Sequence, residues 1–304
     1  MITVLAAMAA STVAGLLAER RSPAFAHRLA TFSLLAIFWV VLPFLIVCTL
    51  PSLRLDTALV RSLGLGWLAL AIAGVAAWFV GSRVLRLPRP STGALICSTV
   101  IANTGYFGLP FTSTLLGRDD LATAIAYDTL ISGPMFYVVG MAIGGRFGAG
   151  DRGLGLSPRA LLLRNPPLLA AIAGLLLPST AVPDALVDTA HDSIWVLLVL
   201  GFVAVGATLA TEADEGAFVF PPRLDPPVRV ALLLRLVLAP AIFLGLTALA
   251  GGAPAAFRVE AAMPAAIGCL IIAHTTKLDL RLSAATIVWS TAIVAVWGIV
   301  ATLL

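Results

Sequence analysis

Charged residues are scarce in this sequence. Asp, Glu, Lys and Arg make up 11% of the 304 residues, hydrophobic residues make up 60%, and the mean hydropathy is +1.05. So few charged side chains cannot cover a soluble domain of this size. Lys277 is the only lysine, and the arginines form short clusters between apolar runs, as membrane topology requires; nucleic-acid binding is not indicated. The composition indicates a multi-pass helical membrane protein.

Cysteine is also rare, and no cofactor or metal site is predicted. Cys48, Cys97 and Cys269 each fall in an apolar run without a CxxC pair or a nearby histidine, so we interpret them as small buried hydrophobes. There is no Walker loop, which excludes transport driven by ATP bound to this chain. The apolar start lacks a positive region before it and predicts a first span, not a signal peptide.

Apolar runs long enough to cross a bilayer recur along the whole chain. A span needs about 20 apolar residues at 1.5 Å rise each. By this criterion the sequence predicts an all-α protein of ten transmembrane helices, the first and sixth short and the fourth long. They lie at about 2–18, 30–50, 62–82, 91–117, 121–143, 166–182, 193–211, 229–250, 257–277 and 283–304.

The basic residues give an orientation. Fifteen of the 19 Lys and Arg residues fall in or beside every second connection, beginning with the one between helices 1 and 2. Arg235, in the first turns of helix 8, is counted with them because its side chain is expected to snorkel to the same membrane face. By the positive-inside rule these connections are cytoplasmic, and both termini lie on the outer face. We therefore expect a multi-pass protein of a bacterial cytoplasmic (inner) membrane.

The longest connection divides the chain into halves of opposite orientation. We predict a first five-helix repeat at 1–145, a cytoplasmic linker at 146–164 and a second five-helix repeat at 165–304. Inverted repeats of this kind place the substrate site near the midplane, on discontinuous helices in corresponding positions. The counterpart of helix 4 would be helix 9.

Helix 4 contains a concentration of helix-breaking and polar residues. Proline lacks an amide hydrogen and glycine loosens the backbone, so the helix is expected to break here. Broken helices at membrane depth are tolerated where protein buries them or where they line a cavity. We predict substrate binding here; the alternative is an ordinary proline kink. The residues concerned are Asn103, Thr104, Gly105, Gly108 and Pro110.

Helix 9 has similar features. Pro264 and Gly268 interrupt it, and His274 follows near its end, so we add Pro264 to the predicted substrate site. Asn103 can donate and accept hydrogen bonds and, beside a half-helix amino terminus, it suits a carboxylate. The alternative for Asn103 is a bond between helices.

Two ionisable residues are candidates for ion or proton coupling. Asp128 is the one acid expected well inside a span, and a carboxyl group there usually pairs, protonates or faces water. If helix 5 begins earlier or tilts, Asp128 lies instead at the outer interface. Histidine side chains can carry protons at physiological pH, although the place of His274 near the cytoplasmic end of helix 9, three residues before Lys277, favours an ordinary interfacial histidine.

Two short motifs resemble one transporter family. The run Asn103-Thr104-Gly105-Tyr106-Phe107-Gly108-Leu109-Pro110 resembles the N-x-x-x-x-G-x-P signature of the auxin efflux carrier family, and Arg164-Asn165-Pro166-Pro167 is similar to its entry to the second half. Length, span number and loop placement are similar throughout, and the short central connection resembles the bacterial members, mostly carriers of organic acids such as malate.

The resemblance implies a fold and a mechanism. It implies two inverted five-helix repeats in which helices 4 and 9 cross at their breaks, a scaffold from helices 1, 2, 6 and 7, a mobile transport unit from the rest, and commonly a homodimer. The implied function is secondary transport of a small organic anion by elevator-type alternating access. Expected partners are that anion, a coupling proton or none, membrane lipid and a second copy.

Two alternatives stay open. A sodium-coupled carrier of the bile acid type would need additional Asn, Gln or acidic ligands beside the break, and this chain has few. An intramembrane enzyme would use Asp128 and His274 as acid and base, but such enzymes usually carry several acids or a cluster of metal ligands. We therefore expect a carrier and not an enzyme.

Overall fold

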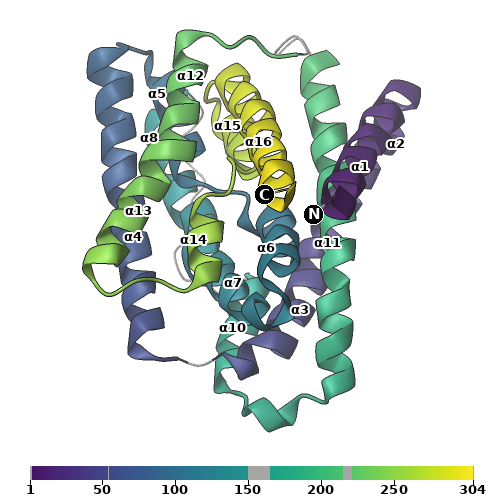
Figure 1. Cartoon of the computed structure of the whole chain (residues 1–304). Coiled ribbons are helices and arrows are strands. Elements are labelled where there is room, and N and C mark those ends of the chain that lie inside the picture. Colours follow the sequence, from purple (N-terminus) through teal and green to yellow (C-terminus); the bar gives the residue numbers. More distant parts are fainter. Residues whose placement is uncertain (1, 54, 150–164, 215–220, 304) are drawn as a thin grey trace.

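The computed structural model describes residues 2–53, 55–149, 165–214 and 221–303, which are helical apart from one isolated β-bridge (Figure 1). Seven helices in this part of the chain are long and apolar enough to cross a membrane. They are α1 (Ile2–Arg21), the run from α2 to η2 (Pro23–Ser52), α4 with η3 (Thr57–Val84), the run from η5 to α8 (Arg118–Phe147), α11 (Asp184–Asp214), the run from α12 to α13 (Pro226–Leu249) and α16 (Leu280–Leu303).

Three further apolar segments are shorter or interrupted. α10 (Pro166–Leu176) is a short helix. α5 (Arg89–Val100) ends before Ile101, and the chain becomes helical again as η4 (Thr104–Gly108) and α6 (Leu109–Leu116). α14 (Ala255–Ala261) and α15 (Gly268–Thr276) form the second interrupted segment. These segments stand where the sequence predicts helices 6, 4 and 9, whereas the inverted-repeat relation between the halves stays a prediction.

Four π-helical turns each end two residues before a proline. They are η1 (Ile37–Val41) before Pro43, η4 before Pro110, η6 (Asp128–Ser132) before Pro134 and η9 (Leu234–Leu238) before Pro240. A proline cannot donate to the preceding turn and its ring pushes a carbonyl aside, so the helix widens there. Such widened turns often occur at functional sites. Here they carry Thr104, Asp128 and Arg235.

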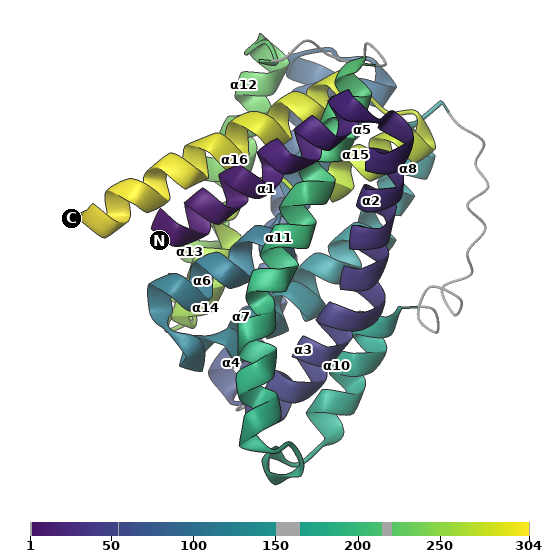
Figure 2. The same cartoon turned by 90° about the vertical axis from the view of Figure 1, so that its right-hand side faces the viewer.

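The helices pack in two groups. α1, α2, α3 (Leu42–Thr49), α10 and α11 contact one another, and α4, α5, α8 (Met141–Phe147), α12 (Pro226–Leu233), α13 (Ala239–Leu249), α15 and α16 form the other group. α14 packs on α13 of the second group, and α6 and α7 (Leu121–Tyr127) lie between α14 and the first group and contact both. The N and C termini lie near one another in both views (Figure 2). That both face outward stays a prediction.

Helix ends differ from the prediction where polar residues begin a helix. The second span begins at Pro23 instead of near residue 30, because a proline suits the first turn of a helix. The seventh begins at Asp184 instead of near 193, because an acidic residue favours a helix amino terminus. Residues 150–164, most of the predicted cytoplasmic linker and including Arg164 of the second motif, lie outside the described residues.

Candidate functional site

The two interrupted helices meet at their breaks. Ala102 and Ala265 form an antiparallel β-bridge. The Asn103 amide donates to the Pro264 carbonyl at 2.7 Å, and the Ala266 amide donates to the Ile101 carbonyl at 3.1 Å. The backbone amides and carbonyls that one break leaves without a helical partner thus form hydrogen bonds with the other break. Inside a membrane such groups have no water to pair with, so these bonds are needed. We call this arrangement the crossing.

The break in the first segment is not where the prolines and glycines predicted it. The non-helical residues are Ile101–Asn103, whereas Gly105, Gly108 and Pro110 lie in the helix that follows. Pro110 occupies the first turn of α6, where a missing amide hydrogen costs little, and the π-turn accommodates its ring. The break is instead stabilised by hydrogen bonds to a peptide more than 150 residues away in sequence.

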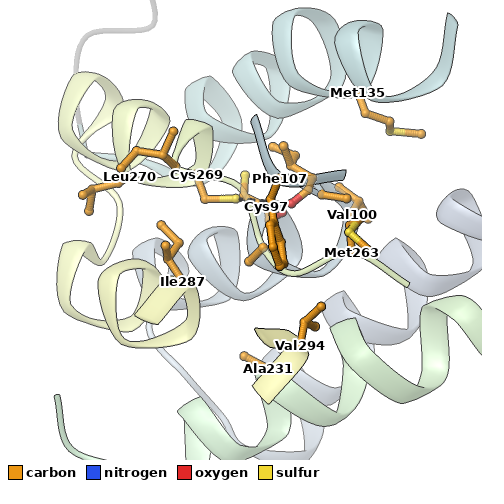
Figure 3. Packing of buried hydrophobic residues seen from close by; sticks show 14 of the residues in the cluster. Cys97, Val100, Phe107, Met135, Ala231, Met263, Cys269, Leu270, Ile287 and Val294 are labelled. Atoms are coloured by element: carbon orange, nitrogen blue, oxygen red, sulfur yellow. Dashed lines mark hydrogen bonds between the residues drawn. The ribbon is translucent and has the colours of Figure 1, made fainter. Parts of the chain in front are cut away.

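Buried side chains, among them Cys97 and Cys269, pack closely around the crossing (Figure 3). The Cys269 thiol of α15 lies 3.4 Å from the Cys97 carbonyl of α5, and both cysteines are buried, as predicted. Ser290 of α16 accepts from the Ala265 amide at 3.1 Å, and its side chain is fully buried. α16 therefore supports the second break from behind.

A cavity of about 120 Å³ opens beside the crossing. Its lining includes the first residues of three helices: Thr104 of η4, Gly268 of α15 and Asn165 at the start of α10. A helix amino terminus carries roughly half a positive charge and unpaired amides, so it favours an anion. The ends at Thr104 and Gly268 can offer amides to a ligand, whereas α10 begins with Pro166 and Pro167 and its Leu168 amide is capped by Asn165, so α10 contributes its dipole alone. This arrangement indicates a site for a small, negatively charged ligand.

The polar side chains of the cavity come from the first break and from η6. Asn103 is buried and lines the cavity. The Thr104 hydroxyl donates to the Asp128 carboxylate, and a Cβ on Gly105 would lie 3.4 Å from an oxygen of that carboxylate. Asp128 therefore lies beside the crossing, while its depth in the membrane stays a prediction.

The structure brings some of the predicted site residues together and separates others. Asn103, Thr104, Gly105 and Asp128 line the cavity. Gly108, Pro110 and Pro264 lie outside its lining, although the Pro264 carbonyl holds the crossing. The roles assigned to all of them stay predictions.

His274 lies apart from the cavity. Its ring is 61% exposed, and Nδ1 lies 3.0 Å from an oxygen of the buried Glu212. It is not among the residues that line the cavity with Asp128. The acid and base pair that an intramembrane enzyme would have needed is therefore not assembled here.

Arg235 was expected to snorkel to the membrane surface, and this expectation is wrong. Its side chain is fully buried, and all three of its hydrogen bonds go to backbone carbonyls at the crossing. It lies on η9, three residues before the end of the turn at Leu238, and is directed inward. The expectation failed because snorkelling is a local rule, whereas these partners come from distant segments.

Glu260 was missed at the sequence level, where Asp128 seemed the one acid well inside a span. Glu260 is fully buried at the end of α14; Oε1 accepts from Thr112 at 2.8 Å, and Oε2 has no hydrogen-bond partner in the described chain. A Cβ on Gly108 would lie 2.1 Å from Oε2, so any larger residue there requires the Glu260 carboxylate to shift. An acid four residues before Pro264 was the available signal. Asn165, whose side chain caps the Leu168 amide at 3.2 Å, was quoted for its motif but not as a site residue.

Comparisons with known proteins point to transport. The chain is 25% identical over 246 residues to an uncharacterized transporter of Methanocaldococcus jannaschii, covering 76% of each chain. It is 26% identical over 219 residues to an uncharacterized transporter of Methanothermobacter thermautotrophicus, covering 70% of this chain and 68% of that one. No family model matches the chain. The chain is thus a multi-pass helical membrane protein similar to proteins named as transporters.

Proposed function

We propose that this chain is a secondary transporter of the auxin efflux carrier type that moves a small organic anion across a bacterial inner membrane. The observation that carries this proposal is the cavity at the crossing, where the amino termini of η4 and α15 meet Asn103. The signature around Asn103 lies on the first break, and similarity to two transporters agrees with the class.

The size of the cavity bears on the substrate. A volume of about 120 Å³ is well below the roughly 300–1,000 Å³ of sites for drug-sized ligands. Its wall combines the polar residues with aromatic rings of Tyr106, Phe136 and Tyr137. A carboxylate of a few carbon atoms, such as malate, fits this description better than a larger aromatic acid such as indole-3-acetate.

Asp128 supplies a route to proton coupling. An ionised carboxylate in the cavity repels an anionic substrate across a few ångströms of low-dielectric surroundings, and protonation removes that repulsion. Proton and anion therefore bind with positive coupling, each strengthening the binding of the other. The carrier would move the two together, with the energy drawn from the proton gradient or the membrane potential.

The two packing groups support alternating access. α1, α2, α3, α10 and α11 would form the scaffold, and the group that carries the crossing would move against it as a unit. The cavity wall includes Asn165, which directly follows the predicted cytoplasmic linker, so we assign this conformation as open to the cytoplasm. A homodimer in the membrane completes the proposal.

Counterflow of radiolabelled malate in proteoliposomes tests the function, with indole-3-acetate as the larger comparison. We expect saturable malate exchange that falls roughly tenfold or more in Asn103→Ala, because a hydrogen bond to a charged ligand is lost. Thr189→Ala is the matched control: Thr189 is an exposed polar residue of α11, outside the cavity. Failure of folded protein to exchange any small carboxylate would overturn the proposed substrate class.

A further inference from the structure

The side chain of Arg235 joins three segments of the crossing. Nε donates to the Met263 carbonyl at 2.9 Å, Nη1 to the Thr99 carbonyl at 3.0 Å and Nη2 to the Ala261 carbonyl at 2.5 Å. The side chain has no exposed surface. Within the described residues no carboxylate lies at ion-pair distance from it. Its positive charge is therefore balanced by backbone carbonyls.

These carbonyls belong to the carboxyl ends of both half-helices. Thr99 lies in the last turn of α5, Ala261 is the last residue of α14, and Met263 lies in the second break. The last carbonyls of a helix have no partner within it, and each helix carboxyl end carries roughly half a negative charge. Two such ends together present about one negative charge. The single positive charge of the Arg235 guanidinium group balances this negative charge, and its N–H groups donate to three of the carbonyls.

Transporters with broken helices use the same place for a coupling ion. Half-helix carboxyl ends and unwound carbonyls coordinate the sodium ion or proton that drives transport. From this geometry we propose that Arg235 is a built-in counterion: it occupies the position of a coupling metal ion at the crossing, so transport by this chain needs no sodium. This inference rests on the proposed transport function. It also assigns Arg235 a positioning role, because it holds both half-helices in place for the cavity on the other side.

The test uses the purified full-length chain in detergent, so it does not depend on knowing the substrate. Thermal unfolding is measured with sodium and with an equal concentration of choline. A ligand that binds the folded state raises the melting temperature. We expect the same melting temperature for the wild type in both salts, and a saturable rise with sodium would overturn the inference.

Variants then test the positioning role. We expect Arg235→Met to lower the melting temperature by roughly 5–10 °C, since three charged hydrogen bonds are lost. Arg235→Lys keeps the charge but not the three-way geometry, so its loss should be smaller. Arg229→Met, at an exposed arginine of α12, is the matched control and should melt as the wild type. Wild-type stability of Arg235→Met would contradict the role.

Transport gives a second readout. In proteoliposomes that exchange substrate, we expect equal wild-type rates in sodium and in choline. Arg235→Lys should exchange at least roughly tenfold more slowly, because small misplacements at a reacting or binding site are costly. If Arg235→Met does not fold, the wild-type salt comparison and Arg235→Lys still decide the matter. If no substrate is found, the melting experiment separates that failure from a failure of this inference.

Discussion

The two sides of the crossing carry opposite helix ends. On one side the amino termini of η4 and α15 meet a cavity lined by Asn103 and Asp128. On the other side the carboxyl ends of α5 and α14 meet around the fully buried Arg235. Both sides are polar. The side with the helix amino termini holds an open cavity, whereas the side with the carboxyl ends is filled by the Arg235 guanidinium group. The charge of the helix ends explains the difference: the positive side is left for an exchangeable anion, and the negative side is neutralised permanently.

The same contrast appears along a single half-helix. Near its start Gly105 faces Asp128 and the cavity, and a Cβ added there would make an ordinary contact of 3.4 Å. One turn later Gly108 faces Glu260, where a Cβ would lie 2.1 Å from Oε2. Gly105, on the cavity side, can therefore accept a methyl group, whereas Gly108, three residues later, cannot accept one without a shift of Glu260.

The largest effect we predict comes from this pair of glycines. Gly108→Ala should destabilise the protein by about 1–3 kcal/mol, because the buried Glu260 carboxylate must move away from Thr112. Gly105→Ala should leave stability nearly unchanged but slow exchange by narrowing the cavity. Thermal unfolding of the two variants in detergent measures the difference. Equal melting temperatures for the two variants would show that Gly108 and the Glu260 carboxylate are not in close contact.

Asn103→Ala should produce the next largest effect, and it should appear in transport instead of stability. The Asn103 side chain lines the cavity, while its backbone amide, which the substitution retains, holds the crossing. We expect the roughly tenfold loss of exchange given above with an unchanged melting temperature. A large loss of stability would indicate that Asn103 serves the packing of helices, the alternative that the sequence left open.

Asp128→Asn should change the coupling more than the rate. Asparagine imitates the protonated carboxyl group, so the repulsion of an anion is absent at every pH. In the wild type, anion binding should weaken as the pH rises and Asp128 ionises. The variant should retain exchange of labelled anion, lose its pH dependence and fail to accumulate substrate against a gradient when a proton gradient is imposed. Retention of proton-driven accumulation in the variant would assign coupling to another group.

The helices were predictable because the length of an apolar run is a local property. The position of the first break was not, because Ile101 and Ala102 are ordinary apolar residues whose extended conformation depends on Pro264 and Ala266 in the other half. The prolines and glycines marked the right segment but not the right residues. Asn103 and Asp128 could be selected as isolated polar residues in spans, yet their meeting at one cavity required the tertiary fold.

Arg235 shows most clearly which contacts cannot be predicted from the sequence. Its partners Met263 and Thr99 are 28 and 136 residues away in sequence, and no local sequence pattern predicts these contacts. The positive-inside rule treats such an arginine as a surface residue, which is correct for the exposed Arg229 one and a half turns earlier. A fully buried arginine becomes recognisable only when carbonyls that need a donor are seen to surround it.

The smallest predicted effect concerns His274, which lies outside both sides of the crossing. Its ring is 61% exposed, and its one polar contact given by the structure is with the buried Glu212. His274→Gln removes the titratable group and keeps a side chain that can donate to Glu212. We expect exchange within about twofold of the wild type, a factor that corresponds to less than 1.4 kcal/mol, and an unaltered pH profile. A shift of that profile would place coupling at the end of α15, and the open side of the crossing would then bind the anion without controlling the proton.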